Sequence, residues 1–514
     1  MAKLLDLLSR GYFPKELPPP FSTEPFAVAV CFSTATLPAS FEDPKLDASL
    51  CYHNLARVGT LRRRLAIPNP ILHYRLCKAI QDNWAQLDTF MRGACLSRSI
   101  PIPGSWGERA LVRLRNPADL ILDRAEVRTT SRYLLKTDIS RFYHSIYTHS
   151  IPWALHGKDY AKKHRGDPIL GNIVDRHIRN SQSQQTLGIP VGPDTSLVIA
   201  ELLLASIDKT LVAEIGNLRG FRYVDDYELC FESRSDAEAA LDLLQVLLGH
   251  YELALNAAKT QILEFPLCLD REWASELRGF EFRPGTAAQA TDLVRFFDRV
   301  AILAQENPDG SVLGYAIRRL EGETIHAKNM KLLVDLLLHC ALIEPRTLPV
   351  VLRHIQHYTL LGFPVDRSKV GEVANNLIGY HAPRGQSSEV AWALWALIVS
   401  EQNITPTAAE AVSKMDDSVV ALLALDAFNR GLVPSGLNTS SWQPFMDEKE
   451  LYGEHWLLSY EANVKRWLSS STGTDHVKND PNFWYLKLKG VSFYDPSASH
   501  GAITTTVLSY EAGI

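Results

Sequence analysis

Two adjacent aspartates, Asp225 and Asp226, interrupt the stretch FRYVDDYELCF at residues 221–231. Aromatic and apolar residues alternate on both sides of them, which predicts two β-strands joined by a tight turn. Two carboxylates at one turn repel each other, and a bound divalent cation would offset that repulsion. The alternative interpretation is a solvated turn, because aspartate is common in turns.

A third carboxylate, Asp138, follows an apolar strand-like segment in LLKTDISRFY. Aspartate in such a place also caps helices, and the two roles are compatible. Three carboxylates from two strands could hold two divalent cations, which is the requirement for nucleotidyl transfer. Magnesium accepts few protein carboxylates and leaves coordination positions for substrate phosphates. The set therefore predicts a Mg²⁺ site, with Mn²⁺ as an alternative metal.

Two further segments lie near these acidic strands in the sequence. QTLGIPVGPDTSLVIAE (185–201) forms a shaped loop with Gly188 and Gly192 before a helix that Thr195 or Ser196 could cap. It is either a plain connection or a platform on which backbone approaches bases closely. Downstream, LALNAAKTQI carries Lys259, which taken alone is an ordinary surface charge.

The order of these segments resembles motifs A, B, C and D of reverse transcriptases. An aspartate at a strand end is followed by a Gly-Pro loop with helix, by Tyr-x-Asp-Asp in a hairpin, and by LNxxKT. Upstream, RRRLAIPNP fits the fingers segment of that family, in which an apolar residue and a proline follow an arginine. The resemblance covers roughly residues 50–285 and implies a palm-type polymerase.

The resemblance assigns roles to the acidic residues. Asp138 and Asp225 match the invariant metal ligands, and Asp226 matches the accessory carboxylate of the hairpin. The backbone carbonyl of Ile139 would add a metal ligand.

It also assigns roles to cations. Arg63 matches the fingers arginine that grips the triphosphate, a task for which a guanidinium fork suits phosphate oxygens. Its neighbours Arg57, Arg62 and Arg64 are less direct candidates, and a solvated basic strand is the alternative for the arginine run. Lys259 would lie near the departing pyrophosphate as a positive charge or proton donor.

Two positions bear on the substrate. Polymerases that accept ribonucleotides often carry an aspartate where this chain has Tyr143, and an aromatic ring there would exclude a 2′-hydroxyl, so deoxynucleotides are expected. Tyr143 could instead be a core aromatic residue. Many reverse transcriptases read Pro-Gln-Gly in motif B, whereas this chain reads Pro190-Val191-Gly192. Valine cannot make the amide contact that this glutamine makes with the incoming nucleotide. Its presence weakens the prediction of ordinary template copying.

Several shorter segments resemble those of the abortive-infection (Abi) reverse transcriptases of bacteria, of the AbiK-like and prophage-encoded types. The segments that carry this likeness are GYFPKELPPPFST, DISRFYHSIYTHSI, GIPVGPDTS and FWYLKLKGVSFYDP. The resemblance implies defence against phage, DNA synthesis without a template, a protein hydroxyl as primer, and therefore a covalently attached DNA product. It also implies a closed homo-oligomer, a trimer or hexamer.

Two tyrosines are candidates for the priming hydroxyl. Tyr52 begins the fingers segment that contains Arg63, and Tyr12 lies in the Pro-rich N-terminal segment, which is expected to be flexible. For both, ordinary packing is the alternative.

Two other functions compete with this interpretation. One is a template-directed enzyme that copies a partner noncoding RNA, as retron enzymes do. The other is a palm that has lost catalysis and binds nucleic acid. The intact carboxylate trio argues against the second, and Val191 with the helical C-terminal half argues mildly against the first.

The expected fold is α+β, with right-hand polymerase fingers and palm at 1–285 and an all-α, HEAT-like repeat domain at 286–514. In the first half the sequence predicts a Pro-rich extended segment to about residue 30, a hairpin at 52–70 turning at Gly59, helices at 69–84, 195–211 and 235–253 (the last capped by Ser235 or Asp236), and a strand that passes into a helix at 131–146. In the second half it predicts helices at 328–344, 347–362, 388–401 and 417–431, a Thr405 cap before Pro406, helix ends at Gly362 and Gly431, and a strand within 484–496.

Composition narrows the cellular setting. The formal net charge of -5 does not indicate nucleic-acid binding, although a local basic face could still bind phosphate. Seven scattered cysteines without CxxC pairs suit reduced thiols. The N-terminus lacks a secretory pattern, and no apolar run is long enough to span a bilayer. A cytoplasmic bacterial protein without a membrane partner is expected.

Overall fold

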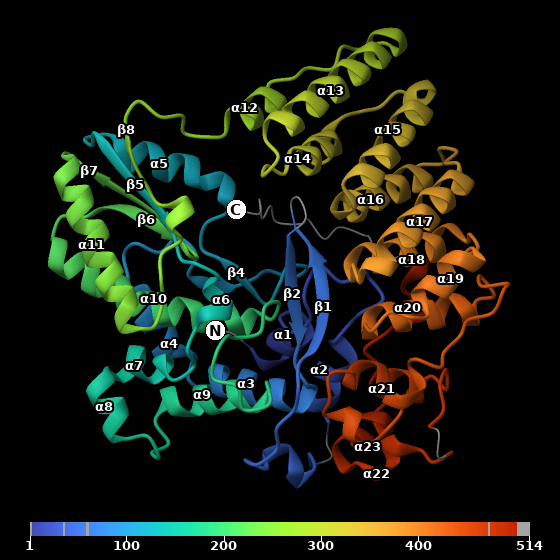
Figure 1. Ribbon diagram of the computed structural model, residues 1–514, viewed down its shortest axis with the longest axis horizontal. Helices are drawn as coiled ribbons and strands as arrows, with labels where there is room; N and C mark the ends of the chain where they lie inside the picture. The colour runs from blue at the N-terminus through green and yellow to red at the C-terminus, as the bar shows by residue number, and fades with distance from the viewer. Residues whose placement is uncertain (1–2, 34–35, 58–60, 471–472, 501–514) are drawn as a thin grey trace.

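The computed structural model describes residues 3–33, 36–57, 61–470 and 473–500. In Figure 1 a sheet covered by helices lies on the left, a curved column of helices lies on the right, and the β1–β2 hairpin stands between them. This arrangement confirms the α+β class, with a polymerase-like half followed by an all-α half. The predicted boundary at 285/286 coincides with the start of the long helix α13 (Thr286–Glu306).

The palm sheet has four antiparallel strands in the order β6-β7-β5-β8. Helices α10 and α11 pack against each other, and α11 also packs on β5 and β7. Asp138 at the end of β5 is the register partner of Asp226 at the start of β7, so the sheet itself brings two of the predicted carboxylates together. The bounds are β5 Tyr133–Asp138, β6 Arg219–Tyr223, β7 Asp226–Phe231, β8 Gln261–Glu264, α10 Asp194–Ile215 and α11 Arg234–His250.

The fingers hairpin is formed by β1 (Cys51–Ala56) and β2 (Arg62–Ile67). Its predicted turn at Gly59 lies outside the described residues. After β2, Asn69 caps α3 (Pro70–Asp82) by accepting a hydrogen bond from the backbone of Ile71 at 3.1 Å. The predicted hairpin and helix are thereby confirmed.

Two helix starts differ from their predictions. Helix α10 begins at Asp194, and the Ser196 hydroxyl donates to the Pro190 carbonyl at 2.5 Å instead of capping the helix. Helix α11 begins after Ser233, whose hydroxyl accepts from the Asp236 backbone at 3.1 Å. In both places several small polar residues compete for the cap, and packing decides among them.

The remaining elements of the first half surround the palm sheet. The chain enters the palm through β3 and β4, and after β5 it continues into α6, which confirms the predicted passage from strand to helix. Their bounds are α4 Trp84–Arg92, β3 Pro101–Pro103, β4 Leu111–Arg113, α5 Leu120–Arg128, α6 Phe142–Ser145, α7 Ser150–His156, α8 Lys158–Lys163, α9 Leu170–Asn180 and α12 Glu272–Arg278.

The helical half is built from two stacked rows. Consecutive helices pack as pairs, and α14, α16, α18 and α20 form one row while α13, α15, α17 and α19 form the other. Such stacking is typical of helical repeats and confirms the HEAT-like prediction. The bounds are α14 Val312–Arg319, α15 Met330–Ile343, α16 Leu348–Leu360, α17 Arg367–His381, α18 Ser387–Ser400, α19 Pro406–Val412 and α20 Ser418–Asn429.

Local signals set the ends of these helices as predicted. Thr405 caps α19 and Pro406 is its first residue. Gly362 and Gly431 follow α16 and α20 with φ values of 82° and 77°, a left-handed conformation that glycine adopts without a steric penalty.

The N-terminal segment packs against the last part of the chain that the structure describes, and two predictions are corrected there. The N-terminal segment is not simply extended, because it forms α1 (Leu4–Ser9) and α2 (Glu24–Cys31). The predicted strand within 484–496 does not form: its first part, 484–488, belongs to α23 (Pro481–Leu488), since Asp480 caps this helix and Pro481 suits its first position. Only an isolated bridge between Phe21 and Tyr494 is strand-like.

One hydrophobic core joins both halves, running from Leu7 to Tyr494. Aromatic contacts join the N-terminal segment to the segment after α23, where the ring centroids of Phe13 and Phe493 are 5.8 Å apart. Between α20 and α23 lie α21 Trp456–Val464 and α22 His476–Asn479. Among the described residues, no helix combines the length and apolar character needed to cross a membrane.

Candidate active site at the end of the palm sheet

The three predicted carboxylates meet where β5 ends and the β6–β7 hairpin turns. Asp138 and Asp226 are paired across β5 and β7, and Asp225 occupies the turn. The backbone N–H of Ile139 donates to the carbonyl of Asp225 at 3.2 Å, which fixes the turn against the strand end. In the described part of the chain, no backbone hydrogen bond reaches the carbonyl of Ile139, so this oxygen is free to act as a ligand.

The turn carries backbone strain at Val224, which has φ 54°. A β-branched residue rarely adopts this conformation, so the surroundings must hold it. The Val224 N–H donates to the Ser99 hydroxyl at 2.7 Å, and its carbonyl accepts from Arg222 at 2.7 Å. The turn is therefore pinned on both sides, and Asp225 and Asp226 have a defined direction.

A buried charge network supports the hairpin from below. Arg222 is fully buried and bonds Glu201 and Asp208, both buried on α10. Tyr227 donates to Asp208 at 2.9 Å and Ser99 donates to Glu201 at 2.6 Å. Sequence reasoning missed this network, although two carboxylates seven positions apart in an apolar helix are a signal that a buried cation must be nearby.

Burial makes the carboxylates costly to ionise. Desolvation, and then the neighbouring Asp138, raises the pKa of Asp225. Desolvation, and then Asp225 and Asp138, raises the pKa of Asp226 to about 7. Such an uncompensated acidic group is suited to a cation that the protein itself does not supply.

Lys259 supplies part of the missing charge. Its ammonium group donates to the Asp138 carboxylate at 2.5 Å, and Thr260 beside it bonds Thr137 at 2.7 Å. As the side chains stand, no three metal-ligating groups in the described ranges are close enough to hold an ion. Metal ligation by the three aspartates and Ile139 therefore remains a proposal, in which Asp138 exchanges Lys259 for the ion.

The arginines of the fingers hairpin have different surroundings. Arg62 is ion-paired with Glu389 of α18, and Arg64 lies over the Tyr52 ring at 3.3 Å. Side chains alternate along a strand, so the exposed Arg63 points to the opposite face. Both Arg63 and Arg57 are close enough to Asp225 to interact with it electrostatically. Of the run, Arg63 is thus the one free to serve the carboxylates.

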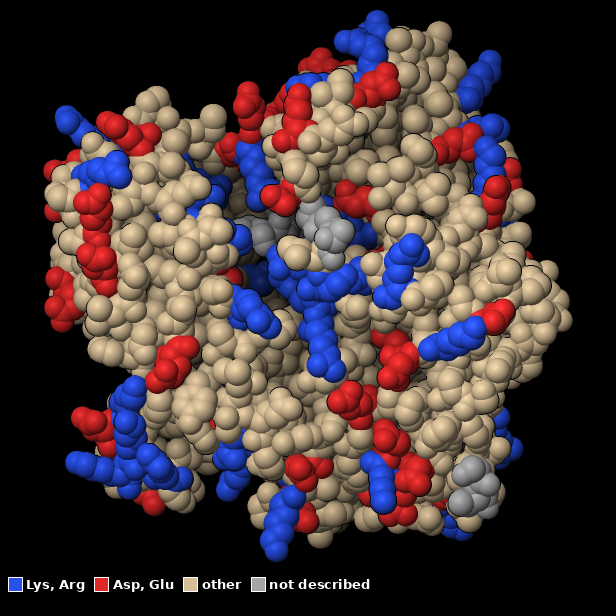
Figure 2. Space-filling view, in the orientation of Figure 1, with Lys and Arg blue, Asp and Glu red and all other residues tan. Residues whose placement is uncertain are grey.

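Two further residues gather near these cations and were not predicted. Arg141 follows the Asp138 strand with φ 47° and is exposed. His144 is exposed, and desolvation, followed by the charges of Arg141, Arg63 and Arg64, lowers its pKa. Figure 2 shows Lys and Arg atoms gathered in the hollow at the centre of this face, around the β1–β2 hairpin. Such a concentration of positive charge suits polyphosphate.

Tyr143 lies beside the catalytic turn. Its ring is half-buried and packs against the cluster of Phe221, Tyr223 and Val224. Desolvation raises the pKa of its hydroxyl. The ring therefore packs in the core beside the turn that carries Asp225, and its role in sugar selection stays a prediction.

The motif B loop is tied to the fingers and to the N-terminal segment. The Val191 carbonyl accepts from the Ala66 backbone in β2 at 2.9 Å. Gly192 has φ 135°, and a Cβ there would lie 2.6 Å from the Pro14 side chain. Glycine is thus required by the close approach of Pro14, a protein contact that accounts for it without any base.

The two candidate priming tyrosines differ sharply. Tyr12 is fully buried, stacks on His73 at 4.1 Å and donates to the Pro68 carbonyl. The expectation of a flexible Tyr12 is wrong, because its ring fills the core. Tyr52 is half-buried under Arg64 on the face of the hairpin opposite Arg63. Reaching the carboxylates would require Tyr52 to move.

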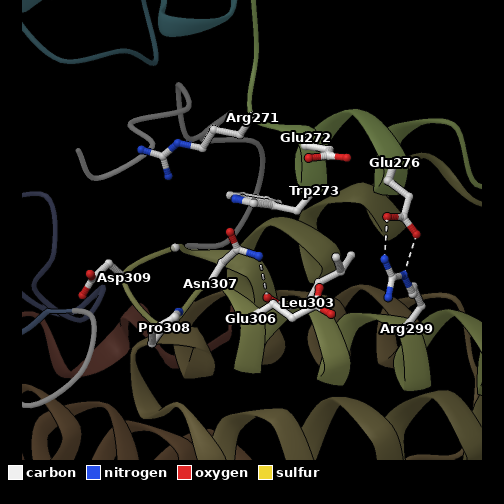
Figure 3. Close-up of a pocket in the computed structure, with 11 residues that line it drawn as sticks. Arg271, Glu272, Trp273, Glu276, Arg299, Leu303, Glu306, Asn307, Pro308 and Asp309 are labelled. Carbon is white, nitrogen blue, oxygen red and sulfur yellow. Dashed lines mark hydrogen bonds and ion pairs between the residues drawn. The ribbon is translucent and has the colours of Figure 1, made fainter. Parts of the chain in front are cut away.

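A separate pocket of about 630 Å³ lies between α12 and the loop after α13. Figure 3 shows Trp273 above Asn307, and Glu276 paired with Arg299 at 2.6 Å. None of the three aspartates lines it. The three predicted carboxylates and the cations around them lie elsewhere, so the carboxylate cluster is the better candidate site.

Comparison with known proteins agrees with this geometry. Residues 67–317 match the family model for reverse transcriptase (RNA-dependent DNA polymerase). No curated protein matched the chain. Among solved structures, a telomerase from Candida albicans in complex with a TWJ fragment of telomeric RNA is similar at 9% identity over 70% of this chain and 66% of that chain, with a TM-score of 0.30. The matched part spans just under two thirds of that telomerase chain, and a likeness this distant carries no argument. The family match identifies residues 67–317 as a reverse-transcriptase domain, which is a nucleotidyltransferase domain.

Proposed function

We propose that the protein is a DNA polymerase of the reverse-transcriptase type that adds dNTPs by two-metal nucleotidyl transfer. The observation that carries this proposal is the convergence of Asp138, Asp225 and Asp226 at one end of the palm sheet, with Arg63 and Arg57 facing them. A palm that only bound nucleic acid would have no use for three partly desolvated carboxylates that repel one another.

The chain's own groups have distinct tasks in this reaction. Asp138, Asp225, Asp226 and the Ile139 carbonyl would hold Mg²⁺ or Mn²⁺, which when bound activates the attacking hydroxyl and stabilises the leaving oxygen. The hydroxyl gives up its proton to solvent, and its oxygen forms a bond to the α-phosphorus as the bond from that phosphorus to pyrophosphate breaks. Arg63 positions the triphosphate. Lys259, released from Asp138, either donates a proton to the leaving pyrophosphate or stabilises it as a nearby positive charge.

The substrate sugar is set by Tyr143. Its ring is fixed against the hairpin by Phe221 and Val224, so it cannot easily yield to a 2′-hydroxyl. The nucleotide site thus favours dNTPs over rNTPs.

Synthesis without a template, in abortive-infection defence against phage in a bacterial cytoplasm, is the finer part of the proposal. It is supported by Val191 in place of glutamine, by the helical half in place of a usual thumb, and by the resemblance of several segments to Abi enzymes. The competing function is a template-directed enzyme that copies a noncoding RNA, and an RNA-dependent reaction would favour it.

The decisive experiment supplies purified protein with Mg²⁺ and dNTPs, with and without RNA. We expect DNA in both reactions and none from Asp225→Ala or Asp226→Ala. Asp416→Ala, which removes an exposed carboxylate of the helical half, is the matched control and should stay active. DNA made by Asp225→Ala would refute the site, and DNA made only with RNA would favour the retron-like alternative.

Priming is proposed to use a tyrosine hydroxyl, with Tyr52 the remaining candidate. The product would then be DNA covalently attached to protein, stable to denaturant and phenol and released by protease. Tyr52→Phe should abolish the adduct while nucleotide binding persists, and Tyr12→Phe should not, because Tyr12 is buried. Free DNA from the wild type, or an undiminished adduct in Tyr52→Phe, would exclude Tyr52.

A further inference from the structure

A second basic surface lies away from the carboxylates, on α8 and its flanks. We propose that this α8 surface binds single-stranded nucleic acid; it consists of Trp153, Tyr160, Lys162, Lys163, His164 and Arg165. Figure 2 shows it as a group of Lys and Arg atoms at the lower left, where Figure 1 places α8. The chain as a whole has a net charge of -5, so a local concentration of cations here is not a reflection of composition.

Cations and aromatic rings are interleaved on this surface. Lys162, Lys163 and Arg165 are exposed, and Tyr160 between them is 48% exposed. The Tyr160 ring stacks on His164 at 4.1 Å, and the His156 ring lies 6.3 Å from it in a tilted arrangement. The cations can pair with phosphates and the rings can stack on unpaired bases, and this combination is typical of sites that bind single-stranded nucleic acid.

The surface is held rigidly although it is exposed. Asn172 donates to the carbonyl of His164 at 2.8 Å and to that of Asp167 at 2.9 Å, and His164 bonds Asp167 at 2.6 Å. The ammonium group of Lys158 lies over the Trp153 ring at 4.2 Å. A braced loop that presents charge loses little conformational entropy when a ligand binds.

Ring contacts connect this surface to the motif B loop. Trp153 contacts Tyr147 at 5.7 Å, and Tyr147 forms a bridge to Leu187, whose side chain is 65% exposed. Leu187 directly precedes Gly188, which lies against the backbone of His144. A strand leaving the catalytic site could therefore pass the exposed Leu187 and the half-buried rings of Tyr147 and Trp153 on its way to α8.

The use of this surface by template or product rests on the proposed polymerase activity, whereas its binding can be measured without catalysis. The assay is fluorescence anisotropy of one labelled sequence as single-stranded DNA, single-stranded RNA and duplex DNA, without divalent metal. Stronger binding of RNA would indicate a template path, and stronger binding of DNA a product path. Because the assay needs neither divalent metal nor incorporation, its result does not depend on catalysis, which separates this test from that of the polymerase function.

Two variants test the two kinds of contact. Lys162→Ala/Lys163→Ala/Arg165→Ala should weaken binding at least tenfold and reduce the salt slope by about 2, since each lost phosphate contact removes about 0.7 from it. Tyr160→Ala should weaken binding by about 5- to 150-fold with an unchanged slope, as expected for one lost stacked base. Tyr160→Phe should bind like wild type.

The control is Lys331→Ala/Lys414→Ala, which removes one exposed lysine from α15 and one from the turn after α19. It should leave affinity and salt slope unchanged. Equal weakening by this control, or unchanged affinity in both α8 variants with normal circular dichroism, would overturn the proposal. Loss in the charge variant but not in Tyr160→Ala would show a general polyanion site and refute single-strand recognition.

Discussion

At the scale of single residues, the catalytic turn concentrates negative charge that the chain does not neutralise. Asp225 and Asp226 are desolvated and close to Asp138, which is ion-paired with the half-exposed Lys259. The free protein therefore bears an energetic cost at this site, and a divalent ion would relieve it. The cost should be visible as a dependence of stability on pH.

We expect Asp226→Asn to stabilise the metal-free protein. The folded-state pKa of about 7 exceeds the ordinary 3.8, so the folded protein loses stability as pH rises between these values. At pH 8 the gain in unfolding free energy should be about 2–4 kcal/mol, and it should shrink towards zero near pH 4. Chemical denaturation at several pH values measures this. A gain independent of pH, or one equalled by Asp416→Asn, would contradict the assignment.

A second residue-scale prediction concerns sugar choice. Tyr143→Val removes the ring that flanks the catalytic turn, so rNTPs should enter and the preference for dNTPs should fall about tenfold or more. Tyr143→Phe keeps the ring and should keep the preference. Competition between dNTP and rNTP measures the ratio, and an unchanged ratio in Tyr143→Val would return this residue to a purely structural role.

At the scale of elements, the β6–β7 hairpin depends on α10 for its position. Arg222 joins the two elements through Glu201 and Asp208, and it also bonds the strained Val224 carbonyl. The position of the aspartates is therefore decided by a helix that contributes no catalytic group.

Arg222→Met should destabilise the protein by about 3–5 kcal/mol, because it leaves two buried carboxylates without a partner. Adding Glu201→Gln and Asp208→Asn to the same chain should recover part of this loss, since the uncompensated charges are then gone. Thermal and denaturant unfolding of the single and triple variants gives both numbers. If the triple variant is no more stable than Arg222→Met, the charges are not the cause.

At the scale of the whole molecule, the helical half is joined to the fingers. Arg62 pairs with Glu389 of α18, His53 bonds Asp417 at the start of α20 at 3.0 Å, and the Ala56 N–H donates to Ser388 at 2.9 Å. These contacts make the hairpin that carries Arg63 part of one body with α18 and α20. Any fingers movement during nucleotide binding would have to involve the helical half as well.

Assembly is the prediction that belongs to this scale. Several large apolar side chains of α15, α16 and the following loop are exposed, including Ile343, Leu360 and Leu361. Apolar surface of this kind favours contact with another protomer. Light scattering should give about three or six times the 57.5 kDa chain mass. A strictly monomeric protein at micromolar concentration would refute assembly, and the helical half would then serve the single chain only.

The sequence by itself determined the elements that bear the chemistry. Alternating side chains fixed the β6–β7 hairpin, the apolar run before Asp138 fixed β5, and Gly362 and Gly431 fixed helix ends. These signals are local, because periodicity and turn chemistry act over a few residues. The helical half was predictable for the same reason, since amphipathic helices of similar length need neighbours to cover their apolar faces.

Only the tertiary structure decided which charged residues act together. The sequence ranked Arg62, Arg63 and Arg64 by motif alone, whereas packing commits Arg62 to Glu389, 327 positions away. Packing also buries Tyr12, although its Pro-rich context predicted a flexible segment. It likewise pairs Arg222 with two acidic residues of α10. Such pairings depend on long-range packing and on the cost of burying charge, and a single sequence does not encode them in any local pattern.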